Sequence, residues 1–296
     1  MAEVAQDLTH GNLIATPLTG TFGARVDGID LGRGLTETEF ATVRSLLRRY
    51  KVLVFHDQAS VGPKELFEFG ERFGKPEVAE HVVHPSCPGF PAVKVLVSSG
   101  TPKGEIPDQA QHGPPIPWDS WHTDGSTRAA SDLRWISILQ AIEIPPVGRD
   151  TLFADMEAAY ENLSPPMKAF LSGLRATHLE GALFFKSMGA LTLPKMKPPV
   201  DHPVVLRDPV TGRDALYVNR MYTTSILGLR PDESEALLNF LYLQAHRPEY
   251  QLRVAWEPKT IVVWENARTQ HYLVQDAHYR RVMHRVMALE PAEAAS

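Results

Sequence analysis

The segment Arg281–Leu289 (RVMHRVMAL) has the composition of a β-strand, with mostly apolar residues, two of them β-branched, and no glycine or proline. Side chains in a strand alternate between its faces, so Arg281, Met283 and Arg285 share one face with Met287 and Leu289. If this face points into the protein, two guanidinium groups lie inside it, about 13 Å apart at about 3.3 Å per residue. Because a buried charge is costly unless it is paired, each arginine then requires an anion. The alternative is a solvated edge strand with both arginines in water.

Further strand patterns follow residue 90, and they outnumber the helical ones. These segments are Val93–Val97, Leu133–Ile142, Thr151–Ala154, Leu174–His178, Ala215–Asn219, Leu252–Trp256 and Thr260–Trp264. Helical spacing and capping residues predict helices that begin at Thr36 and Pro63 and others over Asp155–Leu163, Ser164–Leu174 and Pro231–His246. The pattern predicts an α+β protein with a mainly β core and flanking helices.

The bulk composition is that of a globular protein. The chain has 296 residues, of which 43% are hydrophobic and 22% charged, enough for a sizeable core. This length fits one or two domains, and we expect a single domain over 1–296, with 1–15 and 291–296 flexible. Residues 99–119 and 181–202 are rich in proline and glycine, and we expect two long loops that cover a site.

Charge and cysteine content exclude several function classes. A net charge of −5 without a cationic cluster argues against a nucleic-acid partner. The single cysteine, Cys87, excludes an intrachain disulfide framework and a cysteine-rich zinc site, and it suits a reducing compartment. The sequence shows neither a signal peptide at its start nor a run of about 18 apolar residues. We therefore expect a cytoplasmic protein without a membrane partner.

The motif Trp121–Gly125 (WHTDG) is a candidate metal site. His122 and Asp124 are two positions apart, so in an extended segment both side chains project from the same face. A third candidate ligand, His271, follows the apolar strand and a short loop 149 positions later. Two histidines and one carboxylate leave three coordination positions open, which suits iron(II) that must also bind a cosubstrate and O₂.

Two other interpretations of these histidines exist. His271 can be an ordinary loop histidine, because spacing alone does not separate that interpretation from a ligand. A zinc site of His81, His84 and His122 is also conceivable, but it leaves Thr151, Arg281 and His271 without a role.

At the level of motifs the sequence resembles the taurine and 2,4-dichlorophenoxyacetate family of iron(II)/2-oxoglutarate dioxygenases, over nearly the whole chain. The motifs that carry the resemblance are WHTD at 121–124, GRDTLFAD at 148–155, LYVN at 216–219, WENARTQHY at 264–272 and RRVMHR at 280–285. The resemblance implies a double-stranded β-helix, or jelly roll, with iron at its mouth.

The same resemblance implies roles for individual residues. The iron(II) ligands would be His122, Asp124 and His271. Thr151 and Arg281 would bind the carboxylate groups of 2-oxoglutarate, and the guanidinium fork of Arg281 suits such a group. Arg285 matches the arginine that holds the substrate anion in the taurine enzymes.

The expected substrate pocket departs from that of the taurine enzymes. His81 is retained, whereas His84 replaces a tyrosine, Trp118 an asparagine and Tyr222 a phenylalanine. Phe185 adds a further aromatic side chain from the second long loop. The expected pocket residues are thus His81, His84, Trp118, Phe185, Tyr222 and Arg285. These differences argue against taurine itself.

The resemblance thus predicts an enzyme that hydroxylates a C–H bond of a small anionic substrate and converts 2-oxoglutarate and O₂ to succinate and CO₂. Sulfonates, sulfate esters and aryloxyalkanoates are the expected substrates, with or without fragmentation. The alternative is the same chemistry on a carboxylated natural product or amino acid in biosynthesis. A non-enzymatic 2-oxoglutarate-binding protein would have no need of all five metal and cosubstrate residues. By analogy with the family we expect a homo-oligomer, either a dimer or a tetramer.

Overall fold

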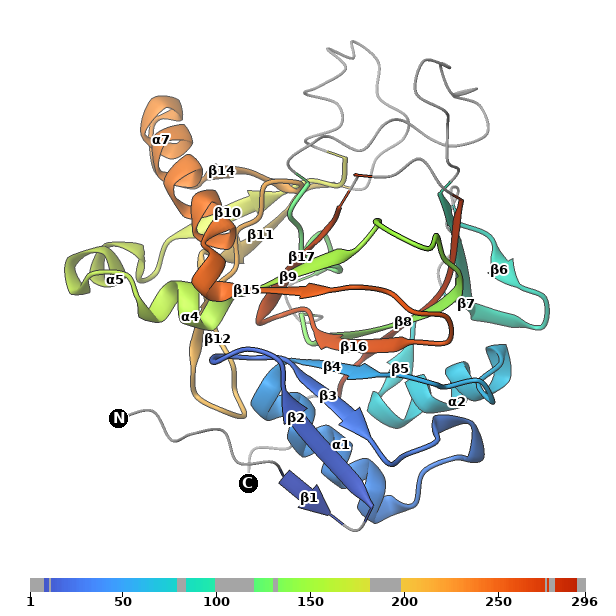
Figure 1. Cartoon of the computed structure of the whole chain (residues 1–296). Coiled ribbons are helices and arrows are strands. Elements are labelled where there is room, and N and C mark those ends of the chain that lie inside the picture. The colour runs from blue at the N-terminus through green and yellow to red at the C-terminus, as the bar shows by residue number, and fades with distance from the viewer. Residues whose placement is uncertain are drawn as a thin grey trace.

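A ten-stranded sheet forms the main layer of the residues that the structure describes (Figure 1). The structure is a computed structural model, and it describes residues 8–10, 12–78, 84–98, 120–129, 133–181, 198–274, 276 and 280–291. In spatial order the sheet contains β1 (Leu8–His10), β2 (Leu13–Pro17), β3 (Ala24–Asp27), β4 (Val52–Phe55), β16 (Ile261–Glu265), β8 (Trp135–Glu143), β18 (Arg281–Leu289), β7 (Phe90–Ser98) and β6 (Ser86–Cys87), and β5 (Lys75–Pro76) pairs with the end of β18. Neighbouring strands are antiparallel except β3 and β4.

The described residues also form three smaller sheets. The one that faces the main sheet has the order β15 (Gln251–Val254), β9 (Thr151–Asp155), β17 (Thr269–Leu273). The others are β11 (Val200–Pro203), β10 (Arg175–His178) and β14 (Thr223–Ile226), and the pair β12 (Val205–Arg207) and β13 (Asp214–Leu216). The chain is therefore a mixed α+β protein with mainly β structure, as predicted.

Strand alternation divides the main sheet into two apolar faces. In β16, Val262 and Trp264 pack with Phe153 of β9 in the core between the two sheets, whereas Ile261 and Val263 belong to the core on the opposite face. The ring centroids of Phe153 and Trp264 are 5.3 Å apart. The small sheet is thus fixed over the main sheet by buried aromatic and β-branched side chains.

Two helices cover the outer face of the main sheet, α1 (Glu37–Tyr50) and α2 (Pro63–Phe73) (Figure 1). Helix α1 begins with the predicted capping box, in which Thr36 and Glu39 bond each other's backbone N–H groups. Helix α2 approaches β18 closely at Gly70, where a Cβ atom would lie 2.6 Å from Val286 Cγ1.

Three more helices, α4 (Met156–Glu161), α5 (Pro165–Leu171) and α7 (Pro231–Tyr242), pack beside the smaller sheets. Short 3₁₀ turns are Leu31–Arg33, Leu243–His246 and Pro248–Tyr250. Within the described segments no helix has the length and apolar character needed to cross a membrane.

Several element boundaries differ from those expected. Strand β1 and the start of β2 lie within the segment 1–15, and Leu13 and Ala15 are buried in the core. The flexibility expected for this segment stays a prediction. Within the predicted loop 181–202, residues 200–202 belong to β11, since the prolines that suggested a loop flank a short edge strand. The predicted strand over 215–219 ends at Leu216. The loop 99–119 and residues 182–197 lie outside the described residues, and the single-domain assignment stays a prediction.

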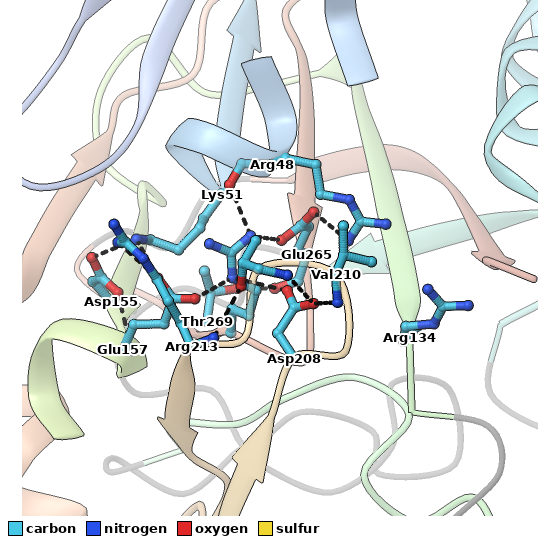
Figure 2. Close-up of polar contacts among 12 residues, drawn as sticks. Arg48, Lys51, Arg134, Asp155, Glu157, Asp208, Val210, Arg213, Glu265 and Thr269 are labelled. Carbon is cyan, nitrogen blue, oxygen red and sulfur yellow. Dashed lines mark hydrogen bonds and ion pairs between the residues drawn. The ribbon is translucent and has the colours of Figure 1, made fainter. Parts of the chain in front are cut away.

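A buried network of charged side chains joins the end of α1 to α4 and to the turn between β16 and β17 (Figure 2). Lys51 Nζ lies 3.0 Å from Glu157 Oε2, and Arg268 Nε lies 2.5 Å from Glu157 Oε1. Arg268 also pairs with Glu265, which in turn lies 3.1 Å from Arg48. Arg268 is 3% exposed, so these ions are paired with each other with little help from water. The network fixes the turn that leads into β17.

Removing Arg268 should therefore destabilise the fold. We expect Arg268→Met to lower the free energy of unfolding by about 3 kcal/mol, because two buried carboxylates each lose a partner. Urea denaturation monitored by circular dichroism measures this change. Arg25→Met, at an exposed pair with Asp27, is the control and should change it by less than about 0.5 kcal/mol. Equal effects of the two substitutions would contradict a stabilising role for the network.

Candidate active site

Backbone pairing brings His122 and His271 together. The two residues form an isolated antiparallel bridge, with His122 N donating to His271 O (3.1 Å) and His271 N donating to His122 O (2.8 Å). Side chains of directly opposed residues lie on the same face, and here the two ring centroids are 4.1 Å apart. His271 lies in β17 and not in a loop, so the ordinary-loop interpretation of this residue is wrong.

Asp124 completes a cluster of three possible metal ligands. It projects from the same face as His122, two positions earlier, and its Oδ1 lies 4.0 Å from His122 Nε2. Its Oδ2 lies 3.9 Å from His271 Nε2. One ligand atom from each residue lies within 4.8 Å of the other two. The predicted triad is therefore assembled.

The protonation states of the triad suit metal binding. His122 Nδ1 lies 2.7 Å from the Ser120 carbonyl oxygen, which can only accept a hydrogen bond. Nδ1 thus carries the proton and Nε2 keeps a free lone pair. Burial lowers the pKa of both histidines, that of His271 to about 3, so both rings are neutral near pH 7. Burial alone would raise the pKa of Asp124, but Arg285 and the two histidines hold it well below its usual range.

These donors fit a divalent first-row metal. Two neutral imidazoles and one carboxylate on one face are the donor set of iron(II) oxygenases, with positions left for other ligands. Thr151 lies on β9, which pairs with β17, and Arg281 lies on β18 of the main sheet.

Arg281 is a buried cation with free hydrogen-bonding capacity. It is 6% exposed, and among the described residues its Nε and Nη2 atoms have no hydrogen-bond partner. Its guanidinium carbon lies 5.2 Å from the centre of the Trp256 ring. Burial, and then the positive charge of Arg149, lower the pKa of Arg281 to about 9. A cation in this state favours an anionic ligand.

Thr151 lies beside the same indole. Trp256 Nε1 is 3.0 Å from Thr151 Oγ1. An indole N–H can only donate, so Thr151 is the acceptor in this bond and retains its own proton for donation elsewhere. Arg281 and Thr151 therefore both contact the side chain of Trp256.

Arg285 lies against the metal cluster. Its Nη1 atom is 3.3 Å from Asp124 Oδ1, and its Nε atom has no partner among the described residues. The ring of Tyr222 meets that of His122 edge-on, with centroids 6.0 Å apart. Strand β18 lies between β8 and β7, so it is not a solvated edge strand. Its inward face carries one arginine at the metal cluster and another beside Trp256.

Comparison with known proteins agrees with this geometry. Residues 15–287 match the family described as "Taurine catabolism dioxygenase TauD, TfdA family". The chain belongs to the TauD/TfdA family of 2-oxoglutarate-dependent dioxygenases. It is thus an enzyme of the dioxygenase class, with a His-Asp-His metal site.

Relatives within the TauD/TfdA family differ in the substrates that their names state. The chain is 31% identical to an alkylsulfatase from Acinetobacter baylyi, over 91% of this chain and 82% of that protein. It is 32% identical to pentalenolactone F synthase from Streptomyces arenae, over 93% of this chain and 94% of that protein. A crystal structure of a taurine dioxygenase from Burkholderia xenovorans superposes with a TM-score of 0.78 at 32% identity, covering 95% of this chain and 90% of that one.

The remaining predicted pocket residues are only partly described. His81, Trp118 and Phe185 lie outside the described residues, and His84 is partly buried just before β6. Their roles stay predictions.

Sequence reasoning missed four residues of the site. Trp256 donates a hydrogen bond to Thr151, and Arg149 places a positive charge near Arg281. Ser137 and Asn266 both form hydrogen bonds with Asp124. Asn266 and Arg149 lie inside two of the motifs that carry the family resemblance, WENARTQHY and GRDTLFAD. Nothing in the strand pattern distinguishes Ser137 or Trp256 from other strand residues.

Proposed function

We propose that this protein is an iron(II)/2-oxoglutarate-dependent dioxygenase that hydroxylates a C–H bond of a small anionic organic substrate. The observation that carries this proposal is the pair of inward-facing arginines on β18, because Arg285 lies 3.3 Å from a candidate metal ligand while Arg281 is a separate buried cation. Two separate cations favour two separate anions. One is the cosubstrate, and the other is the molecule that is oxidised.

The chain's residues would have three tasks. His122, Asp124 and His271 would hold iron(II), and Thr151 and Arg281 would bind the far carboxylate of 2-oxoglutarate. When bound, iron(II) and 2-oxoglutarate activate O₂, so that one oxygen atom enters the substrate as a hydroxyl group and the other enters succinate, with loss of CO₂. Arg285 would hold the substrate anion beside the metal. In this proposal the facing sheets form the double-stranded β-helix of the family.

A sulfonate, sulfate ester or aryloxyalkanoate is the proposed substrate class. When the hydroxylated carbon bears the heteroatom, the product breaks down to an aldehyde and releases the anionic group or phenol. The alkylsulfatase relative supports this class, and the pentalenolactone F synthase relative supports the alternative, a carboxylated natural product or amino acid. His81, His84, Trp118, Phe185 and Tyr222 are the proposed pocket residues besides Arg285. A cytoplasmic homo-oligomer remains the expected form.

A substrate panel tests the proposed function. Aerobic incubation with iron(II), ascorbate and 2-oxoglutarate should yield succinate only with the correct substrate, among sulfonates, alkyl sulfates, aryloxyalkanoates and amino acids. Arg285→Gln should raise the substrate KM at least about tenfold, since a buried charged pair is lost, and leave the 2-oxoglutarate KM nearly unchanged.

Arg280→Gln is the matched control, because Arg280 is 58% exposed and precedes the same strand. It should change neither constant. Loss of 2-oxoglutarate binding in Arg285→Gln would mean that the two arginines of β18 have the opposite roles. Failure of every compound in the panel to stimulate succinate formation would reject the substrate classes named here.

Arg149 adds a second positive charge near the proposed cosubstrate. Its backbone lies in the left-handed region at φ 63°, and its N–H donates to Asp276 Oδ1 at 2.8 Å. A side chain in this conformation costs about 1 kcal/mol relative to glycine. Its Nε atom is buried without a partner among the described residues.

Replacing Arg149 should separate affinity from stability. We expect Arg149→Gly to weaken anaerobic 2-oxoglutarate binding about three- to tenfold, and to leave the free energy of unfolding of the ligand-free protein equal or slightly higher. Arg149→Lys keeps the charge and should retain most of the affinity. Calorimetric titration and urea denaturation measure the two quantities. If Arg149→Gly binds 2-oxoglutarate as tightly as the wild type, the second charge does not act on the cosubstrate.

A further inference from the structure

The side-chain amide of Asn266 is fully hydrogen-bonded beneath the metal cluster. Its Nδ2 atom donates to the Trp135 carbonyl oxygen (3.0 Å) and to Ser137 Oγ (2.8 Å). Its Oδ1 atom accepts from the backbone N–H of Asp124 (3.2 Å) and from Trp264 Nε1 (2.9 Å). These four bonds are close to the full capacity of a primary amide. Exchanging N and O would set its NH₂ group against two N–H donors, so the orientation of the amide is fixed.

This orientation determines where the Ser137 hydroxyl points its proton. Ser137 Oγ accepts from Asn266, so its own hydrogen is available for one donated bond. Asp124 Oδ2 lies 3.0 Å away and, as a carboxylate oxygen, can only accept. Ser137 and Asn266 are both 0% exposed, so water does not compete for these bonds. The result is a directed chain from Asn266 through Ser137 to Oδ2.

The two oxygens of Asp124 therefore have different surroundings. Oδ2 accepts a bond from Ser137, whose position in β8 is fixed by the sheet, and it faces His271 Nε2 at 3.9 Å. Oδ1 faces His122 Nε2 at 4.0 Å and Arg285 Nη1 at 3.3 Å. A carboxylate oxygen has two lone pairs, so each oxygen can accept its hydrogen bond and still bind a cation.

We propose that Ser137 and Asn266 are positioning residues that hold the carboxylate of Asp124 in the orientation in which it binds the metal. A bond to an ionised carboxylate is stronger than one between neutral groups, which makes Ser137 a firm restraint on the rotation of Asp124. This inference rests on the proposed metal site.

The competing interpretation is that these bonds only satisfy buried polar groups between β8 and the turn after β16. It predicts that removing the Ser137 hydroxyl changes stability alone. The positioning role predicts a change at the metal as well, because hydrogen-bond partners of metal ligands alter affinity about 10- to 100-fold.

Manganese(II) binding to the metal-free protein separates the two. It needs no turnover, and it reports affinity by calorimetry and ligand symmetry by electron paramagnetic resonance. Ser137→Ala should bind Mn²⁺ about 10- to 100-fold more weakly and give an altered resonance spectrum. Ser137→Cys, which keeps the volume and a weak donor, should fall between Ser137→Ala and the wild type and serves if Ser137→Ala does not fold.

Thr260→Val is the matched control, because it removes another fully buried hydroxyl, one that bonds His56 at the far end of β16. It should leave Mn²⁺ affinity and spectrum unchanged. Asn266→Asp offers Ser137 an acceptor in place of a donor and should shift the spectrum as Ser137→Ala does. The double variant Ser137→Ala/Asn266→Asp should add little to the loss in affinity, because both changes break the same chain of bonds.

Wild-type affinity and spectrum in Ser137→Ala or, if that variant does not fold, in Ser137→Cys would overturn the positioning role while leaving the metal site intact. No Mn²⁺ binding by the wild type would instead reject the metal site itself, and the positioning role with it.

Discussion

The two backbone hydrogen bonds between His122 and His271 are the constraint on which the active site depends. They fix two residues that are 149 positions apart as directly opposed neighbours, and this register sets both imidazoles on one face. Strand alternation then adds Asp124 to the same face. A shift of one residue in either segment would turn a ligand away from the site. The buried ions around Arg268 matter for the same reason, since they hold the turn that leads into β17.

The region around the paired histidines contains a buried cation that has no anionic partner in the described part of the chain. The fold places Arg281 and Arg285 on the inward side of a central strand, where the usual expectation is apolar side chains. Arg285 contacts Asp124, whereas Arg281 has two donor atoms without partners among the described residues. Natural proteins accept such a cost where a ligand supplies the missing charge. The unpaired Arg281 and a neutral imidazole pair thus describe a site that is incomplete without an anion and a metal.

The sequence was sufficient to predict which side chains share a face, because this follows from residue spacing and from the period of a strand. The i, i+2 motif predicted the shared face of His122 and Asp124, and the period of two predicted that Arg281 and Arg285 share a face of β18. It was insufficient where pairing partners decide. His271 was expected after a loop, because the strand β17 contains polar residues that do not alternate with apolar ones. The roles of Ser137 and Asn266 follow from hydrogen bonds that form only in the folded core, and no local sequence pattern predicts these bonds.

Anaerobic absorption spectroscopy is the most direct test of this account. Adding 2-oxoglutarate to the protein loaded with one equivalent of iron(II) should produce a visible metal-to-ligand charge-transfer band, because the cosubstrate would chelate the metal. The band should be lost in His271→Ala, which lacks one ligand, and should be retained in His56→Ala, which is remote from the site. If iron(II) and 2-oxoglutarate both bind to the wild type and no band forms, the cosubstrate does not meet the metal and the account is wrong.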